Sequence, residues 1–180
     1  MPIPRGLHTF GPSSATLSVR TGRTGAAAKA GHDLLLHVTE WQATLEVADD
    51  STPVALSLDA DGGSLRVREG TGGMQALADD DIASIEQTID DDVLKRQRVA
   101  YRSASIRALG DGRLAADGEL TLVDETRPLT VELAVGGAGA LTASAVIKQS
   151  EWGIKPYSTL FGALKVADDV RVAFEGRLPR

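Results

Sequence analysis

The stretch WQATLEV at residues 41–47 alternates apolar and polar side chains with a period of two. Its odd-numbered residues, from Trp41 to Val47, are apolar, and its even-numbered residues are polar. Successive side chains of a β-strand point to opposite faces, so this pattern indicates a strand with one face buried and the other in water. A helix would place its apolar residues three or four apart, and the stretch therefore predicts a strand.

The same alternation recurs along most of the chain, and turn residues separate the runs. Further alternating runs lie at residues 17–19, 54–58, 65–67, 120–122, 129–135, 141–147 and 170–174. The strings DGG at 61–63, GDG at 110–112 and GGAG at 136–139 each fall between two runs, where they predict antiparallel hairpins. Because closing a sheet removes its exposed edges, the sequence predicts an all-β fold, an antiparallel β-barrel of about eight strands.

The residues just before the opening stretch depart from strict alternation. Between Leu34 and Val38 apolar residues occupy both odd and even positions, whereas only the odd positions are apolar from Trp41 onward. Either the strand bulges near Thr39 and Glu40, or its first half is buried on both faces.

One segment, from Asp79 to about Arg98, has the periodicity of a helix instead. Its apolar residues are spaced three, four and four apart, which places them on one stripe. Acidic residues at 79–81 and basic residues at 95–98 suit the two ends of a helix dipole. The stripe consists of Ile82, Ile85, Ile89 and Val93. We therefore expect one inserted amphipathic helix that covers an open end of the barrel as a lid.

The composition fits one folded domain. The chain has 180 residues, of which 42% are hydrophobic and 24% charged, and it has no cysteine. A chain of this length can bury a core without a disulfide or a metal. The lack of cysteine excludes thiol catalysis, cysteine-ligated zinc and iron–sulfur clusters. We expect residues 1–12 to form an N-terminal tail and residues 13–178 to form a single barrel domain.

Charge and hydropathy disfavour two further classes of partner. The net charge is −6, whereas binding to nucleic acid depends on lysine and arginine contacts to phosphate, so we expect no nucleic acid partner. No run approaches the roughly 20 apolar residues that a membrane-spanning helix needs. The N-terminal residues lack the apolar run of a secretory signal, and we expect a cytoplasmic protein.

Catalytic side-chain types gather only around His32, Asp33 and His37. Residues one or five apart on a strand point to opposite faces, so an oriented base would require a bend there. We expect structural or hydrogen-bonding roles for both histidines, with a metal or catalytic role as the alternative. His8 lies in the expected tail and should be solvated. The acidic string at 59–63 lacks the other ligands of a calcium loop and predicts a turn, so no metal site is predicted.

The expected inner face contains several small residues among its leucines and valines. Small inward side chains leave volume unfilled, so a cavity for a ligand is one outcome for a barrel of this size. A barrel packed solid with side chains is the other outcome. The small residues are Ala43, Ala116, Gly118, Ala143 and Ala145.

Short strings in the second half of the chain resemble one known family in both content and order. The strings are YRS at 101–103, GELTL at 118–122, TRPLTV at 126–131, SEWGI at 150–154 and ADDVRV at 167–172. In this order they resemble the YceI-like family of polyisoprenoid-binding proteins, which have a lipocalin-like barrel. The resemblance is good over residues 97–176, and residues 13–95 match in pattern only. The chain departs from the family at Asp124, where a glycine is usual, and at Glu151–Trp152, where Asp-Phe is commoner.

The resemblance implies a binding protein rather than an enzyme. Its partner would be an amphiphilic isoprenoid lipid, either a polyprenyl lipid or an isoprenoid quinone, held in the barrel lumen without any further cofactor. The loop at residues 155–162 would then lie at the barrel mouth, or form a contact in a homodimer. An enzyme with His32 or His37 as its base, and an interaction module with a solid barrel, are the alternatives.

We expect the large aromatic residues and the inward apolar residues to contact this ligand. Trp and Tyr combine an apolar body with a polar tip, which suits the mouth of an apolar cavity. The predicted ligand-binding residues are Leu36, Val38, Trp41, Leu45, Tyr101, Leu120, Leu122, Leu133, Ile147, Trp152, Tyr157, Phe161 and Phe174.

Overall fold

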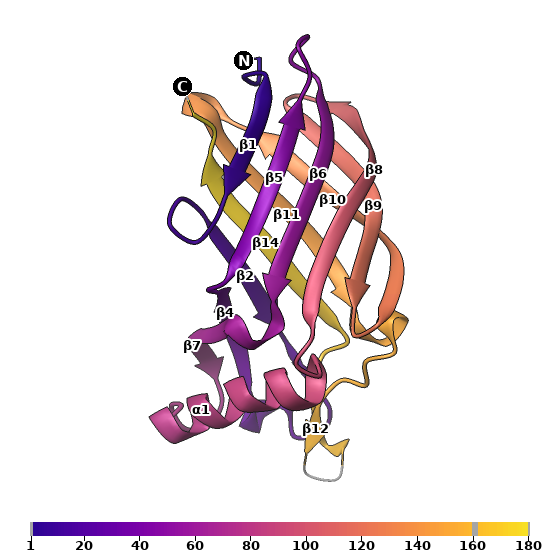
Figure 1. Ribbon diagram of the computed structural model, residues 1–180. Coiled ribbons are helices and arrows are strands. Elements are labelled where there is room, and N and C mark those ends of the chain that lie inside the picture. The colour runs from indigo at the N-terminus through magenta and orange to yellow at the C-terminus, as the bar shows by residue number, and fades with distance from the viewer. Residues whose placement is uncertain (1, 160–161, 180) are drawn as a thin grey trace.

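The computed structural model describes residues 2–159 and 162–179 (Figure 1). Its main feature is an 11-stranded antiparallel sheet with the order β1-β5-β6-β8-β9-β10-β11-β14-β2-β4-β7. The sheet curls into a barrel, as Figure 1 shows. Its strands are β1 (Gly6–Phe10), β2 (Thr16–Thr21), β4 (His32–Val38), β5 (Trp41–Val47), β6 (Pro53–Asp61), β7 (Leu65–Gly72), β8 (Arg98–Gly110), β9 (Arg113–Leu122), β10 (Glu125–Val135), β11 (Ala140–Lys148) and β14 (Asp169–Arg177).

A small second sheet lies at one end of the barrel, beside the loop that contains Tyr157. It has three short strands, in the order β12 (Ser158–Thr159), β13 (Leu164–Val166) and β3 (Arg23–Thr24). Short 3-10 turns complete the fold: η1 (Ala28–Ala30), η2 (Gly62–Ser64), η4 (Gly137–Gly139) and η5 (Gln149–Trp152). No helix in the described part of the chain is long and apolar enough to span a bilayer.

The alternation that predicted a strand at 41–47 is confirmed in β5. All four odd-numbered residues of β5 are buried, while Gln42 and Glu46 are exposed. Two of the three predicted hairpins form, because β8 pairs with β9 across residues 110–112 and β10 pairs with β11 across η4. The hairpin predicted at residues 61–63 is wrong, because β6 pairs with β5 and β8 while β7 pairs with β4, and the chain runs on from β6 into β7 through η2. Local patterning therefore determines most of the sheet.

A bend in one long hairpin completes the ring of strands. Only Thr39 and Glu40 separate β4 from β5, and only η2 separates β6 from β7. The buried Ser64 holds this corner: its carbonyl accepts the Thr39 N–H at 2.9 Å, and its hydroxyl accepts the Glu40 N–H at 3.0 Å. On one side of the bend β4 pairs with β2, and on the other side β6 pairs with β8. The predicted irregularity near Thr39–Glu40 is thus the corner at which the barrel closes.

This bend also explains why the sheet has more strands than expected. When β4–β5 and β6–β7 are each taken as one bent segment, the ring contains β2, β4–β5, β6–β7, β8, β9, β10, β11 and β14. These segments make up the predicted barrel of about eight strands. The remaining strand of the large sheet, β1, lies at its edge.

The prediction that residues 1–12 form a tail is wrong for the part that contains β1. Gly6–Phe10 pairs with β5, from Gly6 opposite Val47 to Phe10 opposite Ala43, and covers the edge that β5 would otherwise expose. His8 is buried rather than solvated, and its Nε2 lies 2.6 Å from the carbonyl oxygen of Pro4. The hydrophobic pattern could not reveal this strand, because Leu7 is 66% exposed and the histidine takes the inner face.

The predicted helix forms, but it ends earlier than expected. The α-helix α1 (Asp79–Thr88) continues into a π-helical turn, η3 (Ile89–Val93). Lys95 and Arg96 have positive φ values of 54° and 57°, so the basic residues follow the helix instead of forming its last turn. The Asp81 carboxylate accepts the Ala78 N–H at 3.0 Å and caps the first turn. Figure 1 shows α1 lying across the end of the barrel opposite the two termini, in the position predicted for a lid.

Aromatic residues fill part of the core on the side of the barrel where β1 packs. The ring of Phe174 meets Phe10 edge to face with a centroid distance of 5.2 Å, and meets Trp41 in the same way at 5.9 Å. These three rings come from β14, β1 and β5 and belong to the larger of two apolar clusters. The smaller cluster surrounds Trp152 and Tyr101.

Candidate functional site

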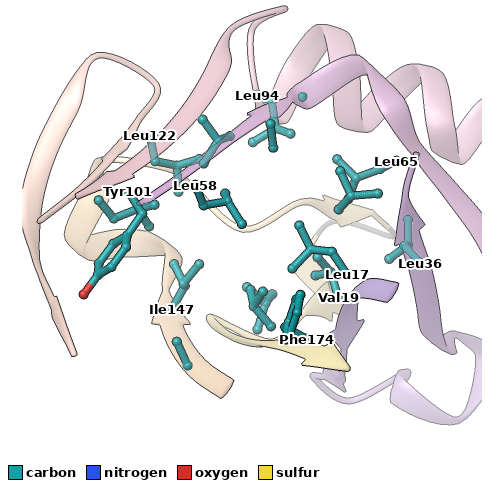
Figure 2. Close-up of a pocket in the computed structure, with 18 of the residues that line it drawn as sticks. Leu17, Val19, Leu36, Leu58, Leu65, Leu94, Tyr101, Leu122, Ile147 and Phe174 are labelled. Carbon is teal, nitrogen blue, oxygen red and sulfur yellow. The ribbon is translucent and has the colours of Figure 1, made fainter. Parts of the chain in front are cut away.

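The lumen of the barrel contains a cavity of about 440 Å³ (Figure 2). All eleven strands of the large sheet contribute residues to its wall, and α1 and η3 contribute more. Figure 2 shows apolar side chains from several strands, among them Val19, Leu58 and Ile147, pointing into this space. Small-molecule sites usually occupy about 300–1,000 Å³, so the cavity has the size of a ligand site.

Small inward side chains leave part of the lumen unfilled, as the sequence suggested. Ala43, Ala143 and Ala145 all line the cavity. Ala116 and Gly118 leave no such space: Ala116 is fully buried in the packed core, and the Tyr101 hydroxyl occupies the volume above Gly118. The barrel is therefore hollow in one part and solid in another, which excludes a barrel packed solid throughout.

The two ends of the cavity differ in their lining. Phe10, Leu133, Leu141 and Phe174 line it at the aromatic cluster. At the opposite end it is lined by the inward side of α1 and η3 and by Tyr157, whose side chain is 48% exposed. The exposed tyrosine marks this end as the mouth.

Ten of the predicted ligand-binding residues line the cavity. They are Leu36, Val38, Leu45, Tyr101, Leu120, Leu122, Leu133, Ile147, Tyr157 and Phe174. Phe161, which was also predicted, lies outside the described residues.

The two predicted tryptophans do not line the cavity. Trp152 is buried, and its Nε1 donates to the Leu120 carbonyl oxygen at 2.9 Å, so its indole serves the packed core. Trp41 packs against Phe174, and its buried Nε1 has no hydrogen-bond partner among the described residues. The prediction placed both rings at the lumen because tryptophan combines an apolar body with a polar tip, whereas packing against neighbouring elements placed them in the core.

Other residues of the wall were missed as site residues, although their signals were present. Val19, Val131 and Val172 lie in alternating runs, and Ile85 and Ile89 belong to the helical stripe. Periodicity identified their inward faces but could not show which inward residues border empty space.

Several polar side chains of the cavity wall are occupied by hydrogen bonds within the protein. Asp61 Oδ1 accepts the Gly63 N–H at 2.9 Å, and Gln149 Nε2 donates to the Ala167 carbonyl at 3.1 Å. Figure 2 shows the Tyr101 ring at the wall with its hydroxyl directed away from the cavity. Burial, and next the nearby charge of Asp117, raise the pKa of Tyr101 to about 12. The wall thus presents mainly apolar surface to a ligand.

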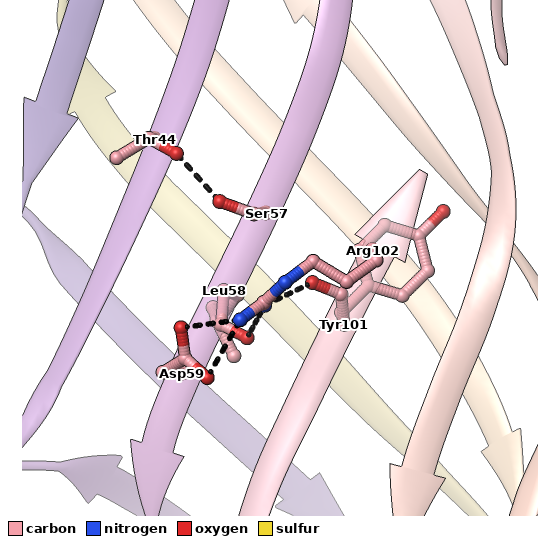
Figure 3. Close-up of polar contacts among 6 residues, drawn as sticks. All are labelled: Thr44, Ser57, Leu58, Asp59, Tyr101 and Arg102. Atoms are coloured by element: carbon pink, nitrogen blue, oxygen red, sulfur yellow. Dashed lines mark hydrogen bonds and ion pairs between the residues drawn. The ribbon is translucent and has the colours of Figure 1, made fainter. Parts of the chain in front are cut away.

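The outer face of the sheet carries the polar residues that the alternation predicts. Figure 3 shows Arg102 on β8 reaching across to Asp59 on β6, with Nη2 at 2.9 and 3.1 Å from the two carboxylate oxygens. The hydroxyls of Thr44 and Ser57 are 2.5 Å apart on the neighbouring pair of strands. These cross-strand contacts lie on the solvent side and leave the lumen free of charge pairs.

The candidate catalytic residues are not brought together. His32 Nε2 lies 2.6 Å from the Gln75 carbonyl oxygen, and Asp33 pairs with Arg23 at 3.6 Å. Partial burial, and next the charge of Arg68, lower the pKa of His37. None of these three residues lines the cavity. Within residues 2–159 and 162–179, no group of three or more His, Asp or Glu side chains is placed to hold a metal ion.

Comparison with known proteins finds one matching family and several solved structures of similar fold. A sequence model of the YceI-like domain matches residues 27–178. The crystal structure of BcnA from Burkholderia cenocepacia is similar, with a TM-score of 0.62 and 15% identity over 89% of this chain and 94% of that one. The YCEI protein of Campylobacter jejuni has a TM-score of 0.59 and 12% identity over 81% and 85% of the two chains. No curated protein matches the sequence.

Proposed function

Because this chain belongs to the YceI-like domain family, we propose that it binds a long-chain lipid in its barrel, and that the lipid is of isoprenoid type. The family is one of binding proteins rather than enzymes, and its members are polyisoprenoid-binding proteins with lipocalin-like barrels. The protein would act as a carrier or a store that shields an apolar chain from water.

The single observation that carries this proposal is the apolar cavity inside the barrel. Its wall comes from every strand of the large sheet and is mainly apolar, and the Asp61 carboxylate and the Gln149 amide nitrogen in it already have partners. Transfer of an alkyl or prenyl chain from water into an apolar cavity is favourable by about 0.8 kcal/mol of free energy for each buried CH₂ group. A lumen of this kind therefore binds a long apolar chain without specific polar contacts along its length.

The lid position of α1 suits the same function. Ile85, Ile89 and Val93 of the helical stripe face the cavity, while Ile82 does not line it. The contact between helix and sheet includes a hydrogen bond from the Val67 N–H to Glu86 Oε1 at 2.9 Å, which satisfies a donor at the outer edge of β7. A chain bound in the lumen would be covered at its open end by this helix.

Mass spectrometry of lipid extracted from the natively purified protein tests the proposal. We expect a prenyl or similar long-chain lipid at close to one molecule per protein chain. The protein stripped of lipid should then rebind geranylgeraniol. Protein that carries no lipid and binds none after stripping would overturn the proposal.

Alanine variants of the histidines separate binding from the alternative of a His base. His32→Ala and His37→Ala should keep their lipid, because neither side chain lines the cavity. Loss of lipid from either variant without loss of stability would favour a role for that histidine at the ligand.

A further inference from the structure

The polar groups of the cavity wall are concentrated toward its mouth. Ser84 and Thr88 of α1, Gln149 at the start of η5, and Tyr157 all contribute to the wall at this end. Toward the aromatic end the wall is mainly apolar, and Ser144, which also borders the cavity there, is exposed on β11. The side-chain carbonyl oxygen of Gln149 accepts no hydrogen bond from the described residues. An amphiphile in the lumen would therefore lie with its tail toward Phe174 and its head group between α1 and Gln149.

This end of the cavity offers no positive charge to a head group. Among the described residues of the wall there is no lysine, arginine or histidine, and Asp61 is the one carboxylate. A charged group that is removed from water without an ionic partner is strongly disfavoured, whereas an alcohol or amide needs only a hydrogen bond. The wall itself thus discriminates against anionic head groups.

The lid adds negative charge around the mouth. Residues 79–81 and 90–92 are all aspartate, and Glu86 lies between them on α1. The nearby Arg96 is bound to Asp91 at 2.6 Å, and this hydrogen bond is the main reason that the pKa of Asp91 is lowered. Residues 79–98 together hold seven carboxylates against Lys95, Arg96 and Arg98, a net charge of −4, and this summed field repels an approaching anion.

We propose that this cavity selects amphiphiles with an uncharged, hydrogen-bonding head group, such as an alcohol, a phenol or an amide, and rejects phosphorylated or carboxylated ones. This inference rests on the proposed lipid-binding function and narrows its ligand class. The head group lies at the α1 end, where the hydroxyls of Ser84 and Thr88 and the amide of Gln149 meet it.

Two pairs of ligands test this selectivity. The members of each pair have the same apolar tail and differ in the head group. Protein stripped of lipid is titrated with geranylgeraniol and with geranylgeranyl phosphate, and in a second pair with hexadecanamide and palmitate, each as monomers. We expect the neutral member of each pair to bind at least about tenfold more tightly. Equal or tighter binding of the anions would overturn the selectivity and leave lipid binding intact. Failure of all four ligands to bind would overturn the proposed function itself.

Lysine substitutions at two neighbouring residues test where in the cavity the head group lies. Ser84→Lys places a cation at a residue of α1 that belongs to the cavity wall, and Ala83→Lys adds the same charge at its neighbour outside the wall; both residues are exposed. The first should reduce the preference for neutral ligands about fivefold or more, and the second by less than about twofold. Equal effects of the two variants, or no effect of either, would contradict a head group at this position.

A third variant keeps the test valid if Ser84→Lys does not fold. Asp61→Asn removes the carboxylate charge from the wall but retains an oxygen that can accept the Gly63 N–H. It should increase the affinity for geranylgeranyl phosphate several-fold and leave that for geranylgeraniol unchanged. Equal affinity changes for both ligands would contradict a charge effect.

Discussion

The hydroxyl group of Tyr101 lies where a side chain at Gly118 would stand. A Cβ atom at residue 118 would be 2.8 Å from this oxygen and 2.3 Å from the Arg102 carbonyl oxygen. The hydroxyl lies 3.0 and 3.1 Å from the carbonyl oxygens of Ala116 and Leu129, which share its single proton as acceptors. One glycine on β9 thus permits both the close approach of β8 and the polar anchor of a buried ring.

A side chain at residue 118 should therefore destabilise the barrel. Gly118→Ala forces the Cβ into the backbone of β8 and is expected to cost about 1–3 kcal/mol of unfolding free energy. In Gly136→Ala, the control, the new Cβ would meet Ala140 Cβ at an ordinary 3.6 Å. Urea denaturation measures both variants, and an equal stability for the two would contradict the close approach.

The raised pKa of Tyr101 predicts a loss of stability in alkali. The folded protein holds this proton until about pH 12, whereas an unfolded tyrosine releases it near pH 10. The contribution is therefore complete below about pH 10 and is lost as the pH rises through about 12; it amounts to at most about 3 kcal/mol. Tyr101→Phe should lack this decline. Denaturation midpoints measured across this range for both proteins test it, and parallel curves would refute it.

Filling the lumen should expel the ligand without unfolding the barrel. Ala143→Leu places three additional carbon atoms in the cavity, so we expect several-fold less lipid to be retained, with a stability change within about 1–2 kcal/mol. The matched variant Thr142→Leu adds bulk to an exposed residue on the outer side of the same strand. Mass spectrometry of retained lipid compares the two, and full retention by Ala143→Leu would place the ligand elsewhere.

Trp152 should affect stability but not ligand binding. In Trp152→Phe the Leu120 carbonyl loses the indole N–H that it accepts at 2.9 Å, which is expected to cost about 1–3 kcal/mol. Thermal denaturation and lipid content are measured on the same preparation. A variant of normal stability that lost its lipid would show that this ring contacts the ligand.

The inward side of the lid should control how fast the ligand leaves. Ile89 lines the cavity and Ile82 does not, although both belong to one helical stripe. Ile89→Ser weakens the apolar cover and should accelerate release of a fluorescent prenol several-fold, whereas Ile82→Ser should have a smaller effect. Stopped-flow displacement gives both rates. The same rate for the two variants would argue that α1 is not the gate.

Periodicity predicted the elements whose two faces meet different surroundings. It succeeded for β5, where every apolar residue is buried, and for α1 and η3, where three of the four stripe residues line the lumen. It failed for β1, where Leu7 is exposed and His8 is buried. That strand forms because the bend at Thr39–Glu40 leaves an edge of β5 without a partner, and no local pattern in residues 6–10 could show this.

The sequence by itself determined the strand faces, two of the three predicted hairpins and the helical stripe, because these depend on residues close together in the chain. Only the tertiary structure decided which small residues leave space. Ala143 borders the cavity, whereas Ala116 is packed and Gly118 is covered by Tyr101. Whether a small side chain leaves a void depends on what reaches it from another strand. For the same reason Trp41 and Trp152, which looked suited to a ligand, became parts of the core.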